Sequence, residues 1–364
     1  MRKFIKNKIS IIIPTYNEAE NINTLLEEII NEVKNKEYEI IIVDDGSNDE
    51  TVNNIFKNYN QNNKIKVIQR EYDRGLLQSI KFALQSISGE YFVVMDGDGQ
   101  HSSKDINVLL KELNHNDLVV GSRDLNNIDS MQQSRVSLSK FFNIVISYIL
   151  PTKLTDPLTG FFAGKIFLLN NKFYLLSNSG FKILLDLIFS NKNKNIKIYE
   201  KKIDFRSRKS GSSKLNSQVV FSFFTQIISY MFNGLISSKF IGFLIIGALG
   251  FSVHFSILFF SLNYLGNSFY FSHIFATLFT ATVNFLLNNY LNFYNSKINT
   301  FKKILVSLLK YYLINLPGII SNISGASFAH NVVTKNPFLA SSIGVVLDTI
   351  FKYFISKTWI WKSN

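Results

Sequence analysis

A short acidic cluster carries the clearest chemical signal in the sequence. Residues 96–100 are Asp-Gly-Asp-Gly-Gln, and they follow directly on the apolar run Tyr91–Met95, which is typical of a buried strand. Carboxylates on a tight turn, with a carbonyl oxygen from Gln100, are hard ligands of the kind that Mg²⁺ or Mn²⁺ prefers. His101 is a further candidate ligand. The alternative is a solvated turn, but the preceding strand and the neighbouring motifs favour a metal site that also accepts diphosphate oxygens.

Two more polar turns follow strand-like runs nearer the N-terminus. They cover residues 14–18 (Pro-Thr-Tyr-Asn-Glu) and 44–49 (Asp-Asp-Gly-Ser-Asn-Asp). A nucleoside needs hydrogen-bond acceptors and a flat apolar neighbour, which Asp45, Glu18 and Tyr16 offer. The alternative is helix capping, because Asn, Asp and Ser are good N-cap residues. We favour a role in binding a nucleotide.

The first 100 residues alternate between strand and helix patterns. Strands are expected at residues 9–14, 38–43, 64–68 and 91–95, and helices at 18–33, 49–58 and 75–86. This alternation predicts a parallel sheet with helices on both faces. Ligands of such sheets bind at the carboxyl ends of the strands, where each polar turn falls, so the turns should meet in space.

The composition changes sharply near Gly234 in this chain of 364 residues. Beyond that point Asp348 is the only carboxylate, and four segments are long enough to span a bilayer. They are about Lys239–Leu262, Ser268–Phe293, Ile304–Ala326 and Phe338–Trp361. The net charge of +13 is weighted to lysines at the ends of these segments, which indicates a membrane protein and not a nucleic-acid-binding one.

Lysines crowd the outer ends of the apolar region and the link between its second and third segments. The positive-inside rule therefore places both termini and the catalytic domain on the cytoplasmic side of the cell membrane. Two amphipathic stretches, Ser134–Leu150 and Leu215–Phe232, could lie flat at the membrane surface. Core helices are the alternative, equally favoured for the first stretch. Cysteine is absent, which excludes disulfides and thiolate metal sites.

Two histidines and one carboxylate lie inside the apolar segments. For His254 and His273 we expect packing or interhelical hydrogen bonds in preference to a proton relay. Asp348 could pair with Lys352 one helical turn on, and a functional role for it stays open.

Further motifs complete a recognisable set. They are Gly121-Ser122-Arg123, Asp156 to Phe162 (DPLTGFF), Gly180 to Leu184 (GFKIL), and Phe205 to Lys214 (FxxRxxGxSK). With the three turns, they resemble the dolichol-phosphate mannose synthases of glycosyltransferase family two, in that family's order over most of residues 9–215. Residues 238–362 resemble the GtrA-like four-helix membrane domain that some of these synthases carry. Leu158-Thr159 and Ser212-Ser213 depart from the usual family residues, so the fine geometry of the acceptor loop stays open.

The resemblance implies a fold and domain boundaries. Residues 1–214 would form an α/β catalytic domain of the GT-A (Rossmann-like) type, which binds a nucleotide-sugar. Residues 215–237 would be an amphipathic interfacial linker, and residues 238–364 an all-α transmembrane domain of four helices.

The resemblance also implies roles for individual residues. The donor would be bound by Pro14, Tyr16, Glu18, Val43, Asp45, Asp96, Gly97, Asp98, Arg123, Lys182, Arg208 and Lys214. The catalytic set would be Asp96, Asp98, Arg123, Arg208 and Lys214. The acceptor phosphate would meet Arg123, Arg135 and Ser213, and the metal would bind Asp98 and Gln100. The basic residues agree with charge logic, because two phosphate groups that approach each other repel unless cations lie between them.

The implied activity is an inverting, metal-dependent sugar transfer onto a polyprenyl or dolichyl phosphate at the cytoplasmic membrane face, which yields a lipid-linked sugar. GDP-mannose is the favoured donor, from the resemblance alone. One alternative is a transferase that uses UDP-glucose or UDP-N-acetylglucosamine. Another is a flippase-like membrane protein whose soluble domain is a regulatory remnant. The intact motifs at residues 96–101 and 208–214 argue against that second alternative.

Overall fold

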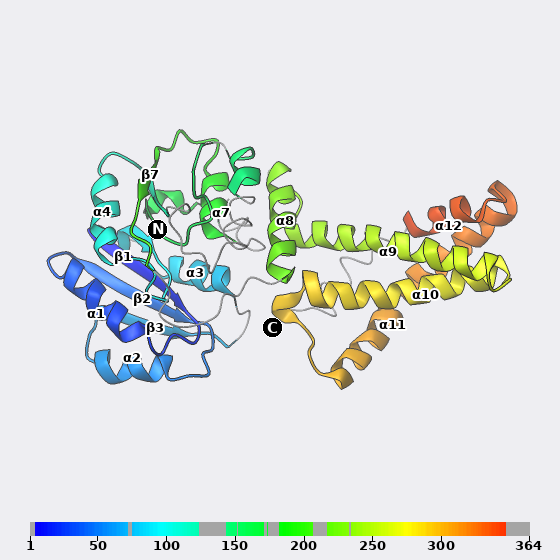
Figure 1. Cartoon of the computed structure of the whole chain (residues 1–364), viewed down its shortest axis with the longest axis horizontal. Coiled ribbons are helices and arrows are strands. Elements are labelled where there is room, and N and C mark those ends of the chain that lie inside the picture. The colour runs from blue at the N-terminus through cyan, green and yellow to red at the C-terminus, as the bar shows by residue number, and fades with distance from the viewer. Residues whose placement is uncertain are drawn as a thin grey trace. The chain divides into compact units, whose positions relative to one another are not determined.

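The computed structural model describes residues 4–71, 75–123, 143–150, 152–170, 173, 182–206, 217–232 and 234–346. The chain divides into two compact units (Figure 1). One comprises residues 1–214 and 230–234, and the other comprises residues 215–229 and 235–364. The first is an α/β unit and the second is helical.

A seven-stranded sheet forms the centre of the α/β unit. Its strand order is β3 (Ile65–Gln69), β2 (Tyr38–Asp44), β1 (Ile5–Thr15), β4 (Gly89–Val94), β6 (Phe162–Lys165), β5 (Leu118–Ser122) and β7 (Ile198–Lys202). The neighbours β3, β2, β1 and β4 are parallel, and so are β5 and β7. Strand β6 is antiparallel to both of its neighbours, β4 and β5.

Helices cover both faces of the sheet. Helix α1 (Ile22–Val33) contacts α2 (Thr51–Tyr59) and α4 (Lys104–Glu112) on one side, and α3 (Leu76–Leu84) contacts β1, β2 and α7 (Ile183–Ser190) (Figure 1). All residues of β2 are buried, as expected for a central strand that is covered on both faces. The main core joins alternate residues of the strands to the apolar stripes of α1 and α4.

The expected strands and helices of the first 100 residues are all present, with shifted ends. Strand β1 begins at Ile5, four residues earlier than expected, and α1 begins at Ile22, four residues later than the expected start at residue 18. The expectation of a parallel sheet, made from the first 100 residues, is confirmed for β1 to β4, and the full sheet also contains β6, which runs antiparallel. The four residues of β6, Phe-Ala-Gly-Lys, are too few to carry a strand pattern, and local sequence does not encode strand direction.

Among the residues that the structure describes in the second unit, three helices are long and apolar enough to cross a membrane. They are α9 (Ser238–Asn263), α10 (Phe269–Leu287) with a π-helical turn that continues to Asn292, and α11 (Phe301–Phe328) with a π-helical turn that continues to Val333. Helix α12 (Pro337–Val346) corresponds to the start of the fourth expected segment, whose remainder lies outside the described residues. Trp361, Asp348 and Lys352 lie there as well.

Polar side chains join these helices from within. His254 Nε2 lies 2.8 Å from Ser341 Oγ, and the same oxygen lies 2.9 Å from His273 Nδ1. His273 Nε2 in turn lies 3.1 Å from Asn322 Oδ1. This series of polar contacts links α9, α12, α10 and α11, and the four side chains that form it are buried. The interhelical hydrogen bonds expected for the two histidines are confirmed.

Close approach of α9 and α10 depends on glycine. A Cβ at Gly250 would clash with Asn284 Oδ1, and one at Gly242 would lie 2.5 Å from Asn292 Oδ1. Small residues allow such close contact between membrane helices, where no hydrophobic effect drives association.

Asn289 closes the end of the second span, because its side chain both donates to the Ile298 carbonyl and accepts from the Ile298 amide.

One of the two amphipathic stretches is a described helix. Helix α8 (Ser217–Met231) covers most of residues 215–232. Only residues 143–150 of the other stretch are described. Placement of either stretch at a membrane surface stays a prediction.

Candidate active site

The three polar turns lie at one edge of the sheet. In the register of β1 and β2, Pro14 is paired with Val43 and Thr15 with Asp44, so residues 16–18 and 45–49 leave the sheet side by side. Met95 donates its backbone N–H to the Ile12 carbonyl, which brings residues 96–100 to the same edge. The expected meeting of the turns is thus a direct result of parallel pairing.

Asp44 organises the first two turns. Its Oδ1 accepts from the backbone N–H groups of Gly46 and Ser47 at 3.1 and 2.9 Å. Its Oδ2 accepts from the hydroxyls of Ser47 and Thr15 at 2.5 and 3.2 Å. Asn17 has a positive φ of 57°, and its side-chain oxygen accepts from the Asn48 backbone. These bonds join the two turns into one preorganised surface.

Asp45 is already engaged within the protein. Its Oδ2 accepts from the Gly75 N–H at 2.5 Å, and its Oδ1 lies 3.3 Å from Arg70 Nη1 and 3.2 Å from Ser79 Oγ. The carboxylate therefore fixes the start of α3. This engagement was not foreseen from the sequence, and a contact of Asp45 with a nucleoside stays a prediction, as it does for Tyr16 and Glu18.

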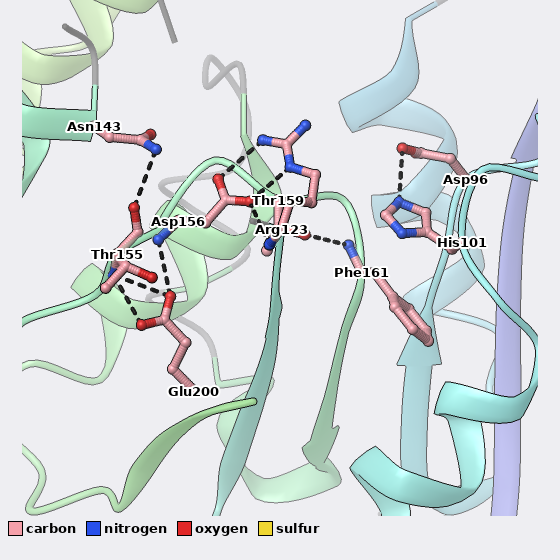
Figure 2. A network of polar contacts seen from close by, with 9 residues as sticks. All are labelled: Asp96, His101, Arg123, Asn143, Thr155, Asp156, Thr159, Phe161 and Glu200. Atoms are coloured by element: carbon pink, nitrogen blue, oxygen red, sulfur yellow. Dashed lines mark hydrogen bonds and ion pairs between the residues drawn. The ribbon is translucent and has the colours of Figure 1, made fainter. Parts of the chain in front are cut away.

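Asp96 lies against a buried histidine. His101 Nε2 is 3.5 Å from Asp96 Oδ2, and the side chain of Asp96 is 36 % exposed while that of His101 is 2 % exposed (Figure 2). The imidazole packs between the rings of Phe161 and Phe205, with centroids at 5.0 and 5.3 Å. The structure therefore places His101 behind Asp96 as its partner.

Charges around Asp96 keep it ionised. Burial by itself raises the pKa of the Asp96 carboxyl. The hydrogen bond and charge of His101 and the charges of Lys182 and Arg123 have the larger and opposite effect, so the pKa falls to about 2. Burial also lowers the pKa of Lys182, and the charge of Asp96 partly offsets this effect. The Asp96 carboxylate thus lies close enough to the basic side chains of Lys182 and Arg123 for their charges to act on it.

Asp98 and Gln100 form the corner where a metal is expected. Asp98 is 8 % exposed, and its Oδ1 accepts from the Gln100 backbone N–H at 3.1 Å, with the intervening Gly99 at a φ of 71°. Gln100 Nε2 donates to the Arg206 carbonyl at 3.3 Å, which leaves the amide oxygen as the end that can meet a cation. Among the described residues, no three or more carboxylate or histidine side chains form a metal cluster. Two oxygen ligands of this type fit a cation that takes its other ligands from diphosphate and water.

Arg123 follows β5 and is held by Asp156. Its Nε and Nη2 donate to the two oxygens of Asp156 at 2.6 and 2.9 Å, and its backbone N–H donates to Oδ2 at 3.3 Å. Burial lowers the pKa of the Arg123 guanidinium, but the hydrogen bonds and charge of Asp156 outweigh that effect and raise it. Arg123 is therefore a permanent cation in a fixed orientation.

Most of the expected site residues lie in the part of the chain that the structure describes. Those in the described ranges are Pro14, Tyr16, Glu18, Val43, Asp45, Asp96, Gly97, Asp98, Gln100, Arg123 and Lys182. Arg135, Arg208, Ser213 and Lys214 lie outside the described residues.

Three further residues of this region had no role assigned from the sequence. They are Asp156, Gly160 and Glu200. The first two belong to the DPLTGFF motif, whose unusual Asp-Pro and Thr-Gly steps were a usable signal. Glu200 lies in the charged stretch of β7, and nothing in its local sequence distinguishes it.

Two family matches cover most of the chain. Residues 10–174 match the family described as Glycosyl transferase family 2, and residues 242–361 match the GtrA/DPMS transmembrane domain. The chain therefore belongs to glycosyltransferase family 2, with a GtrA/DPMS membrane domain after the catalytic domain.

Several proteins with similar sequences are named as sugar transferases that act on a polyprenyl phosphate. The chain is 30 % identical to a dolichol-phosphate mannosyltransferase of Pyrococcus furiosus over 97 % of its own length and 99 % of the relative's. It is 28 % identical to the dolichol-phosphate mannosyltransferase of Saccharomyces cerevisiae over 60 % of this chain and 85 % of the relative. A third relative, from Photorhabdus laumondii, is an undecaprenyl-phosphate 4-deoxy-4-formamido-L-arabinose transferase, 33 % identical over 38 % of this chain and 43 % of the relative.

A solved structure resembles the chain more distantly. Glucosyl-3-phosphoglycerate synthase from Mycobacterium tuberculosis, in complex with Mn²⁺, UDP and phosphoglyceric acid, aligns with a TM-score of 0.47 and 18 % identity. The alignment covers 61 % of this chain and 78 % of that chain.

The protein is thus a membrane glycosyltransferase of GT-A type. More particularly, it belongs to the polyprenyl-phosphate sugar transferases that include the dolichol-phosphate mannosyltransferases.

Proposed function

We propose that the protein transfers mannose from GDP-mannose to a polyprenyl or dolichyl phosphate, with Mg²⁺ or Mn²⁺, and inverts the anomeric carbon. The observation that carries this proposal is the similarity to the Pyrococcus furiosus dolichol-phosphate mannosyltransferase over 97 % of the chain, which includes both domains. The membrane domain supports a lipid acceptor, because a soluble acceptor would not require one.

The donor's diphosphate would lie beside the metal corner. Asp98 and Gln100 would hold the cation, which when bound neutralises negative charge on the departing nucleoside diphosphate. Asp96, ionised at neutral pH, would accept hydrogen bonds from the donor. Arg123 and Lys182, with Arg135, Arg208 and Lys214, would meet the phosphates of donor and acceptor, and Ser213 would add a hydroxyl at the acceptor phosphate.

No side chain needs to remove a proton from the acceptor. A lipid phosphate is already ionised at neutral pH, so one of its oxygens can attack the anomeric carbon directly. The new bond joins that carbon to the lipid phosphate oxygen, and the bond to the nucleoside diphosphate breaks on the opposite side. Catalysis then consists of positioning and of stabilisation of the leaving group's charge.

Substitution of Asp98 tests the metal site. We expect the variant Asp98→Ala to lose transfer by at least about a hundredfold while it keeps the wild-type unfolding temperature and membrane yield. The control is Asp117→Asn, which removes an ion pair with Lys165 (3.0 Å) before β5 and should retain full activity. Normal turnover by the Asp98 variant would contradict the proposed metal role.

A second candidate donor is a different nucleotide-sugar. The Photorhabdus laumondii relative supports this candidate, because it is named for transfer of another sugar to a polyprenyl phosphate. A panel of radiolabelled GDP-mannose, UDP-glucose and UDP-N-acetylglucosamine, with membranes and a short polyprenyl phosphate, separates the candidates. Preferred use of GDP-mannose supports the first proposal, and preferred use of a UDP-sugar supports the second. Absence of any lipid-linked product contradicts both.

The proposed boundaries are residues 1–214 for the catalytic domain, 215–237 for the interfacial linker and 238–364 for the membrane domain, with both termini in the cytoplasm. The absence of cysteine makes the topology directly testable, because each introduced thiol is unique. Exposed positions in the links before α10 and before α11 are Leu265 and Asn299. A membrane-impermeant maleimide should label Leu265→Cys only from outside the cell, and Asn299→Cys only in inverted vesicles. The reverse pattern would overturn the proposed orientation.

A further inference from the structure

The loop of residues 155–160 lies between Asp96 on one side of the site and Arg123 on the other. Strand β6 is inserted between β4 and β5 and runs opposite to both, and its Phe162 is paired with Val94 on one side and Val120 on the other. Asp96 follows β4 and Arg123 follows β5. The residues just before Phe162 must therefore pass between Asp96 and Arg123 (Figure 2).

Asp156 makes a two-point contact with Arg123 from this loop. Its side chain is only 1 % exposed, and its two oxygens accept from Nε and Nη2 of Arg123, whose side chain is 21 % exposed. Figure 2 shows that one guanidinium nitrogen points away from the carboxylate. A paired planar contact of this kind fixes the rotation of the guanidinium as well as its position.

Glu200 holds Asp156 in place. Its carboxylate accepts from the Asp156 N–H at 2.8 Å and from the Thr155 N–H at 2.9 and 3.0 Å. Glu200 is paired with Val120 in β7, and Asn143 Nδ2 donates to the Thr155 carbonyl at 3.2 Å. The loop is therefore fastened to the sheet on the side that carries Arg123.

We propose that Asp156, anchored by Glu200, is a positioning residue that directs the edge of the Arg123 guanidinium that does not contact Asp156 toward the phosphates during sugar transfer. This inference rests on the proposed phosphate role of Arg123. A lone arginine would have several rotamers and would point away from the site for part of the time. Asp156 removes that freedom before substrate arrives, so less ordering is needed in the transition state.

The test compares four single variants, one of them a control, with one double variant in the full-length protein. Asp156→Asn retains the shape of the side chain but replaces one acceptor oxygen by an N–H donor, and Glu200→Gln does the same one step further out. We expect kcat to fall about 30-fold in Asp156→Asn and about 5-fold in Glu200→Gln, with the KM for the nucleotide-sugar changed less than threefold. Asp117→Asn, which breaks an ion pair of similar length elsewhere in the sheet, is the matched control.

A double-mutant cycle with Arg123→Ala distinguishes positioning from general structure. If Asp156 acts through Arg123, addition of Asp156→Asn to Arg123→Ala should lower kcat by less than about threefold. A further loss of about 30-fold in that background, or equal activity of Asp156→Asn and wild type, would overturn the inference. Full activity of Arg123→Ala alone would instead contradict the phosphate role of Arg123. Thermal unfolding of every variant shows whether it folds, and Glu200→Gln keeps the test decisive if Asp156→Asn does not.

Discussion

A carboxylate oxygen of Asp96 occupies the space that a side chain at Gly160 would need. A Cβ at Gly160 would lie 2.6 Å from Asp96 Oδ2 and 2.9 Å from Oδ1, distances that Cβ atoms essentially never show. The loop that holds Arg123 through Asp156 is thus shaped at its other end to admit Asp96.

Substitution of Gly160 should displace Asp96 without unfolding the domain. In Gly160→Ala the carboxylate must rotate away from the new methyl group, and with it from His101. We expect kcat/KM for sugar transfer to fall at least about tenfold, with an unfolding temperature close to that of wild type. Gly99→Ala provides a contrast, because no atom lies within 4 Å there but the positive φ of 71° strains any side chain. That variant should lose activity through the metal corner. Wild-type kinetics in Gly160→Ala would show that the position of Asp96 is not critical.

Removal of His101 should impair the function of Asp96 by loss of a contact, whereas Gly160→Ala acts by a steric clash. A phenylalanine fills the space between Phe161 and Phe205 but provides neither hydrogen bond nor charge for Asp96. We expect His101→Phe to lower kcat/KM about tenfold, since a hydrogen bond to a charged group contributes about 1.5–3 kcal/mol. The same change at the exposed His115 should have no effect. If both variants match wild type in initial-rate assays, the contact with His101 has no part in catalysis.

Glu39 should contribute stability that depends on pH. Burial by itself raises the pKa of its carboxyl. Hydrogen bonds from the Ser88 backbone, Ser10, Lys66 and the Ser88 hydroxyl have the larger and opposite effect, so the pKa falls to about 2. Because the folded pKa lies below the ordinary value of 4.5, the ionised group stabilises the fold above that value. The contribution is lost as the pH falls from about 4.5 toward 2.

The measurement for Glu39 is unfolding of the purified protein in detergent at several pH values. Glu39→Gln should lower the free energy of unfolding of the α/β unit by about 2 kcal/mol at pH 7, and the difference should shrink below pH 4. Glu37→Gln, at an exposed neighbour, serves as control. A difference that stays constant from pH 7 to pH 3 would show that the charge of Glu39 is not the source of its stabilisation.

Ser341 should hold the membrane helices together. Its hydroxyl contacts both His254 and His273, so Ser341→Ala removes two interhelical hydrogen bonds from a buried position. We expect the membrane domain to lose about 1 kcal/mol of stability, measured by thermal unfolding in detergent, with transfer activity within twofold of wild type. In the adjacent Ser342, the hydroxyl donates to Phe338 of its own helix, so Ser342→Ala is a matched control. Equal stability of the two variants would contradict a linking role for Ser341.

The order of strands explains which contacts could be foreseen. The turns after β1, β2 and β4 were expected to meet, because each follows a strand of a parallel group and parallel strands end at the same edge. The engagement of Asp45 by Gly75 and Ser79 was not foreseen, since it depends on where α3 begins relative to β2. The interhelical bonds of His254 and His273 were expected because buried polar groups in a membrane need partners, but Ser341 could not be named as that partner from sequence.

The sequence by itself determined that an acidic turn at residues 96–100 follows an apolar strand, and that the second half of the chain is apolar and belongs in a membrane. These are properties of composition and short-range periodicity, which local residues carry on their own. Only the tertiary structure decided that β6 runs antiparallel between β4 and β5. As a result, Asp156 accepts hydrogen bonds from Arg123, and the lack of a side chain at Gly160 leaves space for the Asp96 carboxylate. The physical reason is that strand order and register arise from contacts between residues far apart in the chain, which no local pattern encodes.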